Sequence, residues 1–248
     1  MNDHLTAVAQ ARTSFDRLLQ QEKYAALIRD DGHLELLLGM IDLQPGQRAL
    51  DIGTGTGYLA FPLAQLQPQA QVHGIDIAEN VIRRNVEAAA RQGLGNLHFA
   101  AFDGLCYPFP AQSFDLIVTR YALHHFPQME QTAQAIAALL KPGGKLLIAD
   151  PLHHPEDQHG VIDRFMAVKA DGHMRFYDVP ELEALFSPLK LERTVFSTMR
   201  FPFPPKPEYA ILLQNLTPEQ KSWYALSERD GIVRVGRISV GNLLFTKV

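Results

Sequence analysis

Residues 47–60 read QRALDIGTGTGYLA, a short apolar run followed by alternating glycines at Gly53, Gly55 and Gly57. The apolar run predicts a buried strand, because residues of this kind fill a strand that is covered on both faces. The glycines let the backbone turn tightly and approach a ligand closely. A helix is expected directly after them, and its free N–H groups and dipole favour a carboxylate or a phosphate. The stretch therefore predicts a strand, a ligand-binding turn and a helix; a tight turn without a ligand is the less favoured interpretation.

The same order of strand and helix continues along the chain. Apolar runs predict strands at residues 47–52, 71–77, 96–101, 114–119, 144–149 and 189–197, and the tail 231–248 predicts a final strand or hairpin. Apolar stripes at helical spacing predict helices at residues 58–66, 78–91, 130–140, 161–169 and 180–186, with more helix before residue 44. Strands that alternate with amphipathic helices indicate a doubly wound, Rossmann-like α/β sheet with helices on both faces.

Length and composition exclude several classes of protein. The 248 residues predict a single domain, and the formal net charge of −4 makes a nucleic-acid partner unlikely. The one cysteine, Cys106, excludes an intramolecular disulfide and is expected to be a small buried apolar residue. No apolar run is long enough to cross a bilayer, and no secretion signal opens the chain, so the expected location is the cytoplasm.

The ligand of the glycine turn has more than one interpretation. Gly55-x-Gly57-x-x-Ala60 also satisfies a dinucleotide-binding pattern, and Asp76 ends the next strand, where a carboxylate accepts hydrogen bonds from ribose hydroxyls. An NAD(P)-dependent oxidoreductase and an S-adenosylmethionine-binding protein both fit these residues.

Three downstream motifs separate the alternatives. Asp103-Gly104 follows the third predicted strand, Tyr121-Ala-Leu-His124-His125-Phe126 follows the fourth, and Leu140-Lys-Pro-Gly-Gly-Lys precedes the fifth. In this order they resemble the class I S-adenosylmethionine-dependent methyltransferases, within them the ubiquinone/menaquinone-biosynthesis-type group, over residues 47–151. The resemblance implies a seven-stranded mixed sheet whose last strand is antiparallel. It also implies S-adenosylmethionine as cofactor and a small-molecule methyl acceptor; a non-catalytic S-adenosylmethionine-binding protein stays an alternative.

The resemblance also implies which residues bind the cofactor. The glycine turn would contact its methionine part, Asp76 its ribose, Ile77 its adenine ring and Asp103-Gly104 its adenine edge, while Arg120 and Tyr121 would line the methionine end. The implied cofactor residues are Asp51, Gly53, Thr54, Gly55, Gly57, Asp76, Ile77, Asp103, Gly104, Arg120 and Tyr121.

Two histidines are the candidate catalytic residues. His124 and His125 follow the fourth predicted strand, where ligands bind in α/β sheets, and a histidine there can take a proton from the acceptor. The alternative is a pair of loop histidines that only pack, because positioning beside an activated methyl group can be sufficient. The histidines between His124 and His173 lack the spacing of a zinc-binding helix, so no metal is expected.

The flanking segments are expected to choose the acceptor. Residues 1–44 predict a helical lid, residues 45–151 a cofactor-binding half, and residues 152–248 a substrate-side half with an insertion at 199–229. The insertion carries an aromatic set that either caps an acceptor pocket or makes a homodimer contact: Phe201, Phe203, Tyr209, Trp223 and Tyr224.

Overall fold

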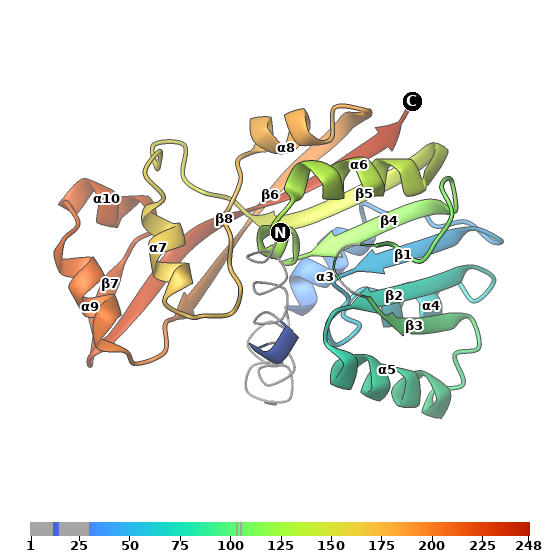
Figure 1. Ribbon diagram of the computed structural model, residues 1–248, viewed down its shortest axis with the longest axis horizontal. Coiled ribbons are helices and arrows are strands. Elements are labelled where there is room, and N and C mark those ends of the chain that lie inside the picture. Colours follow the sequence, from blue (N-terminus) through green and yellow to red (C-terminus); the bar gives the residue numbers. More distant parts are fainter. Residues whose placement is uncertain (1–11, 15–29, 103, 105) are drawn as a thin grey trace.

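The computed structural model of the chain describes residues 12–14, 30–102, 104 and 106–248, which form one mixed sheet (Figure 1). The eight strands of these residues run in the order β3-β2-β1-β4-β5-β8-β6, and β7 pairs only with β8. Five strands are parallel: β1 (Arg48–Ile52), β2 (Gln71–Asp76), β3 (Leu97–Ala101), β4 (Phe114–Arg120) and β5 (Leu140–Pro151). The strand order reverses around β1, and this is the place where open α/β sheets bind ligands.

The antiparallel strand predicted for the tail is present. β8 (Ile232–Lys247) runs antiparallel to β5, β6 (Leu189–Pro202) and the short β7 (Ser227–Arg229). The predicted mixed sheet with an antiparallel last strand is therefore confirmed, with the three-residue β7 as an addition to the expected seven strands.

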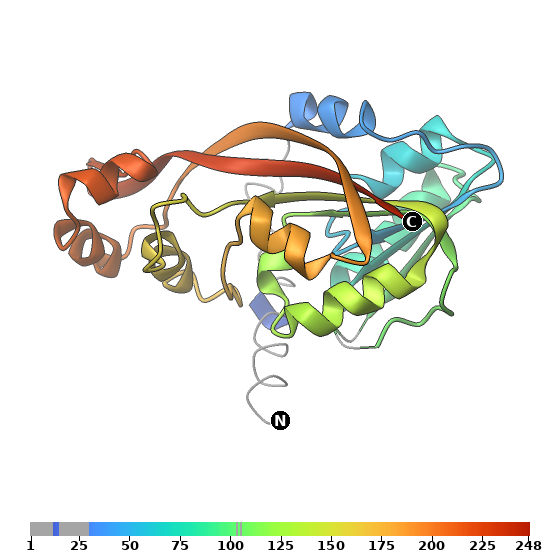
Figure 2. The same cartoon turned by 90° about the horizontal axis from the view of Figure 1, so that it is seen from above.

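Helices cover both faces of the sheet, as predicted. Figure 2 shows α3 (Asp31–Leu38) and α4 (Ala60–Leu66) on one side and α6 (Met129–Leu139) and α8 (Val179–Leu185) on the other. α5 (Glu79–Arg91) contributes Ala89 to the apolar core under α3 and α4. Alternate residues of β1 enter the two cores, since Ala49 packs on the α4 side and Leu50 on the α6 side.

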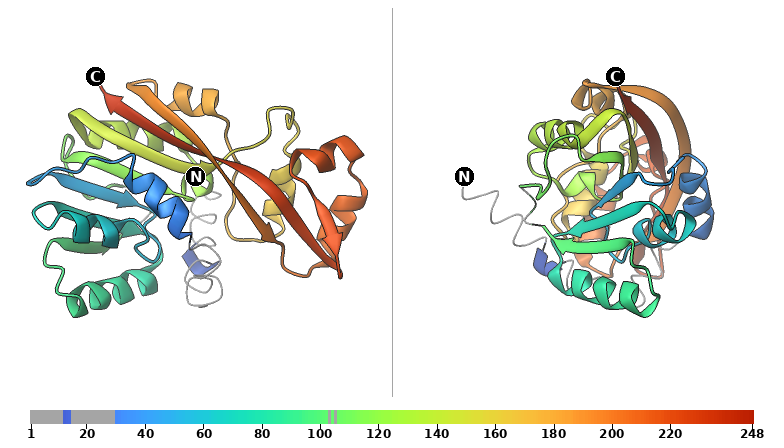
Figure 3. Two further views of the ribbon diagram at one scale, coloured as in Figure 1. Left: turned by 180° about the vertical axis from the view of Figure 1, so that it is seen from behind. Right: turned by 90° about the vertical axis from the view of Figure 1, so that its right-hand side faces the viewer.

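A distal lobe extends beyond the sheet. It consists of α7 (Val161–Ala167), α9 (Pro207–Gln214), α10 (Pro218–Trp223), β7 and the far ends of β6 and β8 (Figures 1 and 3). A third apolar core fills this lobe, with Phe165, Phe203 and Tyr209 among its buried residues.

Several local predictions are wrong. The apolar stripe of the predicted helix at residues 78–91 includes Val86 as an inward residue, but Val86 is 48% exposed. The polar Asn85 is buried instead, and its side chain bonds the glycine turn. Cys106 is exposed rather than buried. β6 continues to Pro202, so the segment expected as an insertion from residue 199 begins inside a strand.

The predicted helical lid of residues 1–44 is described only in part. Residues 1–11 and 15–29, most of the predicted lid, lie outside the described residues, whereas α3 confirms the predicted helical stripe with Leu37 buried. No helix in the described part of the chain has both the length and the apolar character needed to cross a membrane.

Candidate functional site

A cleft of about 1340 Å³ opens where the carboxyl ends of β1, β2 and β4 meet. Pockets for one small ligand hold roughly 300–1000 Å³, so this cleft has room for two ligands. It is lined by most of the predicted site residues: Asp51, Gly53, Thr54, Gly55, Asp76, Ile77, Gly104, Arg120, Tyr121, His124 and His125. Asp103 lies outside the described residues, and Gly57 is not among the residues that line the cleft.

The glycine turn is held by the buried carboxylate of Asp51. Its Oδ2 accepts a hydrogen bond from Thr54 Oγ1 at 2.7 Å and from the N–H of Ala60, at the start of α4, at 3.2 Å. Burial raises the pKa of Asp51 to about 7. Gly53 has a φ of +67°, and a Cβ there would stand 2.5 Å from the Cβ of Ala122, so only glycine fits. Asp51 and Gly53 thus shape the turn that meets the ligand.

Asp76 and Asn85 hold the same turn from the side of β2 and α5. Asp76 accepts the N–H of Gly55 at 2.8 Å and that of Ala78 at 2.9 Å, one on each carboxylate oxygen. Asn85 Nδ2 donates to Gly55 O at 2.8 Å. A carboxylate has about four acceptor positions, so Asp76 retains capacity for ribose hydroxyls. Sequence reasoning missed Asn85, whose signal is a polar residue at an inward position of an amphipathic helix.

Arg120 lies between two aromatic rings at the end of β4. Its guanidinium carbon is 3.9 Å from the ring centroids of both Tyr58 and Tyr121, and its Nε–H donates to His33 Nδ1 at 3.2 Å. Tyr121 has a φ of +55°, which bulky residues rarely adopt. Such strain is typical of functional positions. Burial raises the pKa of Tyr121 to about 12, so its hydroxyl stays neutral.

His124 forms a buried dyad with Asp150. His124 belongs to the single turn η1 (Leu123–His125) after β4, and its Nδ1 lies 2.5 Å from Asp150 Oδ1 near the end of β5. Asp150 Oδ2 accepts the N–H groups of Ala122 and Leu123 at 3.1 and 3.0 Å. Burial, with His173 and Lys169 nearby, lowers the pKa of His124 well below its usual value. The sequence interpretation found the histidine and missed Asp150, although Asp150, like Asp51, is a carboxylate near the carboxyl end of a predicted strand.

His125 lies against His124, with ring centroids 4.1 Å apart. Burial is the main cause that lowers the pKa of His125 well below its ordinary value. Both histidines are therefore neutral near pH 7, and the ring of His124 has the Asp150 carboxylate within hydrogen-bond distance.

The distal lobe supplies the opposite wall of the cleft. This wall is largely apolar and is formed by Met166, Phe176, Met199, Phe201 and Phe203. Lys169 and Asp171 also line it, and Lys169 Nζ stands 4.6 Å from the ring centroid of Phe201.

The predicted aromatic set divides in the structure. Phe201 and Phe203 line the cleft, whereas Tyr209 and Tyr224 are buried in the core of the distal lobe. The Trp223 ring stacks on His154, with centroids 5.6 Å apart.

Residues 12–14 contact both sides of the cleft region. Arg12 Nη1 lies 3.3 Å from Glu79 Oε1 on α5, and Ser14 Oγ donates to Ala170 O at 3.0 Å. Such contacts suit a lid, which stays a prediction.

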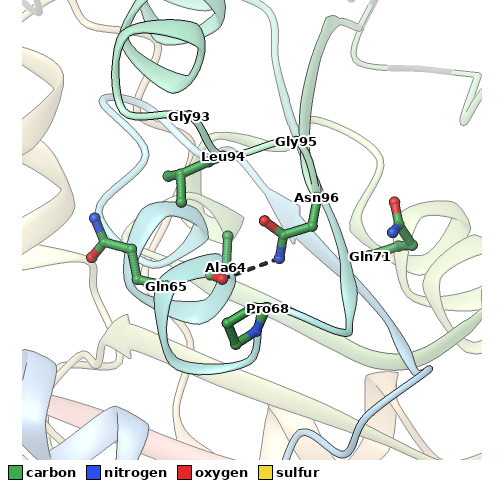
Figure 4. A pocket seen from close by; sticks show the side chains of 8 residues that line it. All are labelled: Ala64, Gln65, Pro68, Gln71, Gly93, Leu94, Gly95 and Asn96. Carbon is green, nitrogen blue, oxygen red and sulfur yellow. Dashed lines mark hydrogen bonds between the residues drawn. The ribbon is translucent and has the colours of Figure 1, made fainter.

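Two other places are weaker candidates. His153, Asp178 and Glu181 could surround a metal ion, but a capping box joins Asp178 to Glu181, and His153 and Arg175 bond the Glu181 carboxylate. A second pocket of about 520 Å³ lies at the amino ends of β2 and β3 (Figure 4). Asn96 there donates to Ala64 O at 3.1 Å, and no titratable side chain lines the pocket, so the larger cleft is the candidate active site.

The sequence of the chain is similar to those of known methyltransferases. Nocamycin O-methyltransferase of Saccharothrix syringae is 38% identical over 120 residues, which are 48% of this chain and 43% of that protein. A demethylmenaquinone methyltransferase of Geobacillus kaustophilus is 31% identical over 111 residues, 44% of this chain and 47% of that one. The matched stretch thus spans less than half the length of these relatives.

Solved structures share the fold. The YcgJ protein of Bacillus subtilis has a TM-score of 0.79 at 21% identity, covering 88% of this chain and 99% of that one. A phosphoethanolamine N-methyltransferase 2 of Haemonchus contortus, in complex with S-adenosylhomocysteine, has a TM-score of 0.63 at 19% identity, covering 88% of this chain and 53% of that one. Residues 43–189, more than half of the chain, match the family Methyltransf_31, described as a methyltransferase domain. The chain belongs to this methyltransferase family.

Proposed function

We propose that the chain transfers the methyl group of S-adenosylmethionine to a hydroxyl group of a small molecule with an apolar, aromatic body, and that His124 is the general base. The family match supports a methyltransferase over the nicotinamide-dependent alternative. The related nocamycin enzyme is named as an O-methyltransferase, and the Haemonchus enzyme binds S-adenosylhomocysteine.

The cleft fits the cofactor part by part. The glycine turn, whose Gly53 leaves no space for a Cβ, allows close approach of the ligand to the backbone. Asp76 suits the ribose hydroxyls, and Arg120 suits the carboxylate of the methionine part, because a guanidinium binds a carboxylate through two parallel hydrogen bonds. When bound, the cofactor supplies an electrophilic methyl group on its sulfonium.

The His124–Asp150 dyad is the observation that carries the choice of a hydroxyl acceptor. Asp150 receives two backbone N–H groups on Oδ2, so Oδ1 is left to accept the Nδ1–H of His124. Burial also raises the pKa of Asp150, and while Asp150 is ionised this contact fixes the tautomer and leaves the lone pair of His124 on Nε2. Burial keeps the ring neutral, and a neutral imidazole can take the proton that a hydroxyl loses when it is methylated. If catalysis needed only the positioning of the acceptor beside the methyl group, the His124–Asp150 dyad would not be required.

The apolar wall of the distal lobe supports an acceptor with an apolar, aromatic body. Phe176, Phe201 and Phe203 offer ring faces and edges to a flat apolar molecule. Lys169, Asp171 and Arg200 are charged residues on this wall, so the acceptor would also meet polar side chains.

The proposal is tested by His124→Gln and Asp150→Asn, assayed with S-adenosylmethionine and a panel of phenols and hydroxyquinones. We expect kcat to fall roughly 10²- to 10⁴-fold in both variants, because a general base contributes this much. The KM for S-adenosylmethionine should change little. Activity of the unmodified protein should decline as the pH falls through the lowered pKa of His124, below about 6.5.

The control is His98→Gln, which changes an exposed histidine of β3 outside the cleft and should keep full activity. Full activity of His124→Gln would refute the base. Binding of S-adenosylhomocysteine without methyl transfer to any panel member would favour the non-catalytic alternative.

A further inference from the structure

A chain of hydrogen bonds runs through His33 and joins α3 to the end of β4 and to the interior of β8 and β6. The His33 side chain is buried, and its Nε2 lies 2.7 Å from Asn242 Oδ1 on β8. Its Nδ1 lies 3.2 Å from Arg120 Nε and 3.4 Å from the Tyr121 hydroxyl. None of these contacts belongs to the dyad, and sequence reasoning found neither His33 nor Asn242.

The orientation of Asn242 decides the tautomer of His33. Asn242 Nδ2 donates to Val195 O at 2.9 Å and to Ser197 Oγ at 3.1 Å, both on β6. The amide oxygen therefore faces His33, and an amide oxygen only accepts hydrogen bonds. His33 Nε2 must carry the proton, which leaves a lone pair on Nδ1 for the Nε–H of Arg120.

This lone pair fixes the guanidinium of Arg120. The rings of Tyr58 and Tyr121 confine the guanidinium plane from both faces, each with its centroid 3.9 Å from the guanidinium carbon. Stacking alone leaves rotation within that plane, and the bond from Nε to His33 removes it. The terminal nitrogens are then the donors that a carboxylate in the cleft meets, since Arg120 lines the cleft.

We propose that His33 is a positioning residue that orients Arg120 toward the carboxylate of the methionine part of the cofactor. This inference rests on the proposed use of S-adenosylmethionine. Asp30 and Asp31, at the start of α3, line the same cleft, and their negative charge suits the ammonium group of the same amino acid moiety. The backbone N–H of His33 bonds Asp30 Oδ1 at 3.0 Å, so one residue ties both charges together.

The test compares two ligands that differ in the amino acid moiety. S-Adenosylhomocysteine carries the carboxylate, and 5′-methylthioadenosine lacks it; both are titrated by calorimetry. We expect His33→Phe, which keeps a ring of similar size, to weaken S-adenosylhomocysteine binding about 5- to 10-fold. Arg120→Met should weaken it roughly 10- to 100-fold, the range for a lost charged hydrogen bond. Binding of 5′-methylthioadenosine should stay within about twofold in both variants, and His98→Phe, the same change at an exposed position, should alter neither affinity.

The double variant provides the second measurement. If His33 acts through Arg120, adding His33→Phe to Arg120→Met should not weaken S-adenosylhomocysteine binding further. Equal losses for both ligands in His33→Phe, or additive losses in the double variant, would overturn the inference and leave the proposed function standing. Failure of the unmodified protein to bind either ligand would instead refute the proposed cofactor.

Discussion

Three buried carboxylates near strand ends build the turns of the candidate active site. Asp51, Asp76 and Asp150 lie at the ends of β1, β2 and β5, and each accepts at least one backbone N–H from the segment that contacts the cleft. A buried carboxylate without partners is costly, so these bonds stabilise both the charge and the turn. These candidate site residues thus also hold the backbone around the cleft.

Asp76 allows this double role to be separated. We expect Asp76→Ala to weaken S-adenosylhomocysteine binding by about 1.5–3 kcal/mol, because the ribose loses a charged acceptor. The 2′-deoxy analogue of S-adenosylhomocysteine, which lacks one ribose hydroxyl, should lose less affinity than the parent in a parallel calorimetric titration. Equal losses for the two compounds would assign Asp76 to the backbone of the glycine turn alone.

The lowered pKa of His73, which lies outside the cleft, predicts that the protein loses stability at acid pH. Burial, with Arg48 and His98 nearby, lowers its pKa from 6.5 to about 4. The unfolded chain therefore binds a proton before the folded chain does, so the free energy of unfolding falls as the pH drops from about 6.5 to 4. Since the ring is only partly buried, we expect about 1–2 kcal/mol from this residue.

Urea denaturation at pH 7.5 and 4.5 measures this effect. His73→Gln should lose less stability between the two pH values than the unmodified protein, and His159→Gln, a change at an exposed position, should match the unmodified protein. An identical pH dependence in His73→Gln and the unmodified protein would contradict the lowered pKa.

At the scale of elements, the apolar pattern of the sequence predicted those strands that local sequence determines. The apolar runs at residues 71–77 and 114–119 predicted β2 and β4, because a strand buried between two helical layers is apolar on both faces. The start of β6 at Leu189 was predicted, but its carboxyl end was not, because Pro202 is typical of a break in a strand, while in the structure it pairs at the end of an edge strand. His33, Asn85 and Asp150 were missed for another reason: their partners are remote in sequence, and only the fold brings them together.

The glycine turn gives a prediction at this scale. Gly57 and Gly46 share a φ of +78°, but a Cβ on Gly57 would stand 2.4 Å from Phe61, whereas nothing lies within 4 Å of one on Gly46. We expect Gly46→Ala to cost about 1–2 kcal/mol of stability from the left-handed backbone alone. Gly57→Ala should cost about 1–3 kcal/mol more, because Phe61 packs on Phe99 and cannot move freely. Equal losses of unfolding free energy in urea would show that the contact with Phe61 is relieved without cost.

At the scale of the whole molecule, the placement of the three apolar cores determines which parts can open independently. Two cores cover the faces of the sheet, and the third fills the distal lobe. The cleft has one wall at the sheet and the other in the distal lobe. Separate cores permit separate opening, so we expect that the distal lobe can unfold without the half that holds the glycine turn.

The hydroxyl of Tyr224 tests this separation. It accepts the N–H of His154, just after β5, at 2.7 Å, and donates to Asp157 Oδ2 at 2.7 Å, while Asp157 also accepts the first N–H groups of α7. Tyr224→Phe should cost about 1–3 kcal/mol, because buried polar groups lose their partner. Hydrogen exchange should accelerate in α7, α9 and α10 and stay unchanged in β1, β2 and β4.

Tyr209→Phe is the matched control, since this tyrosine is buried in the same lobe and its hydroxyl has no hydrogen-bond partner within the described part of the chain. We expect that variant to leave stability and exchange nearly unchanged. Faster exchange throughout the sheet in Tyr224→Phe would mean that the three cores unfold as one unit. In that case the acceptor wall could not open independently of the glycine turn.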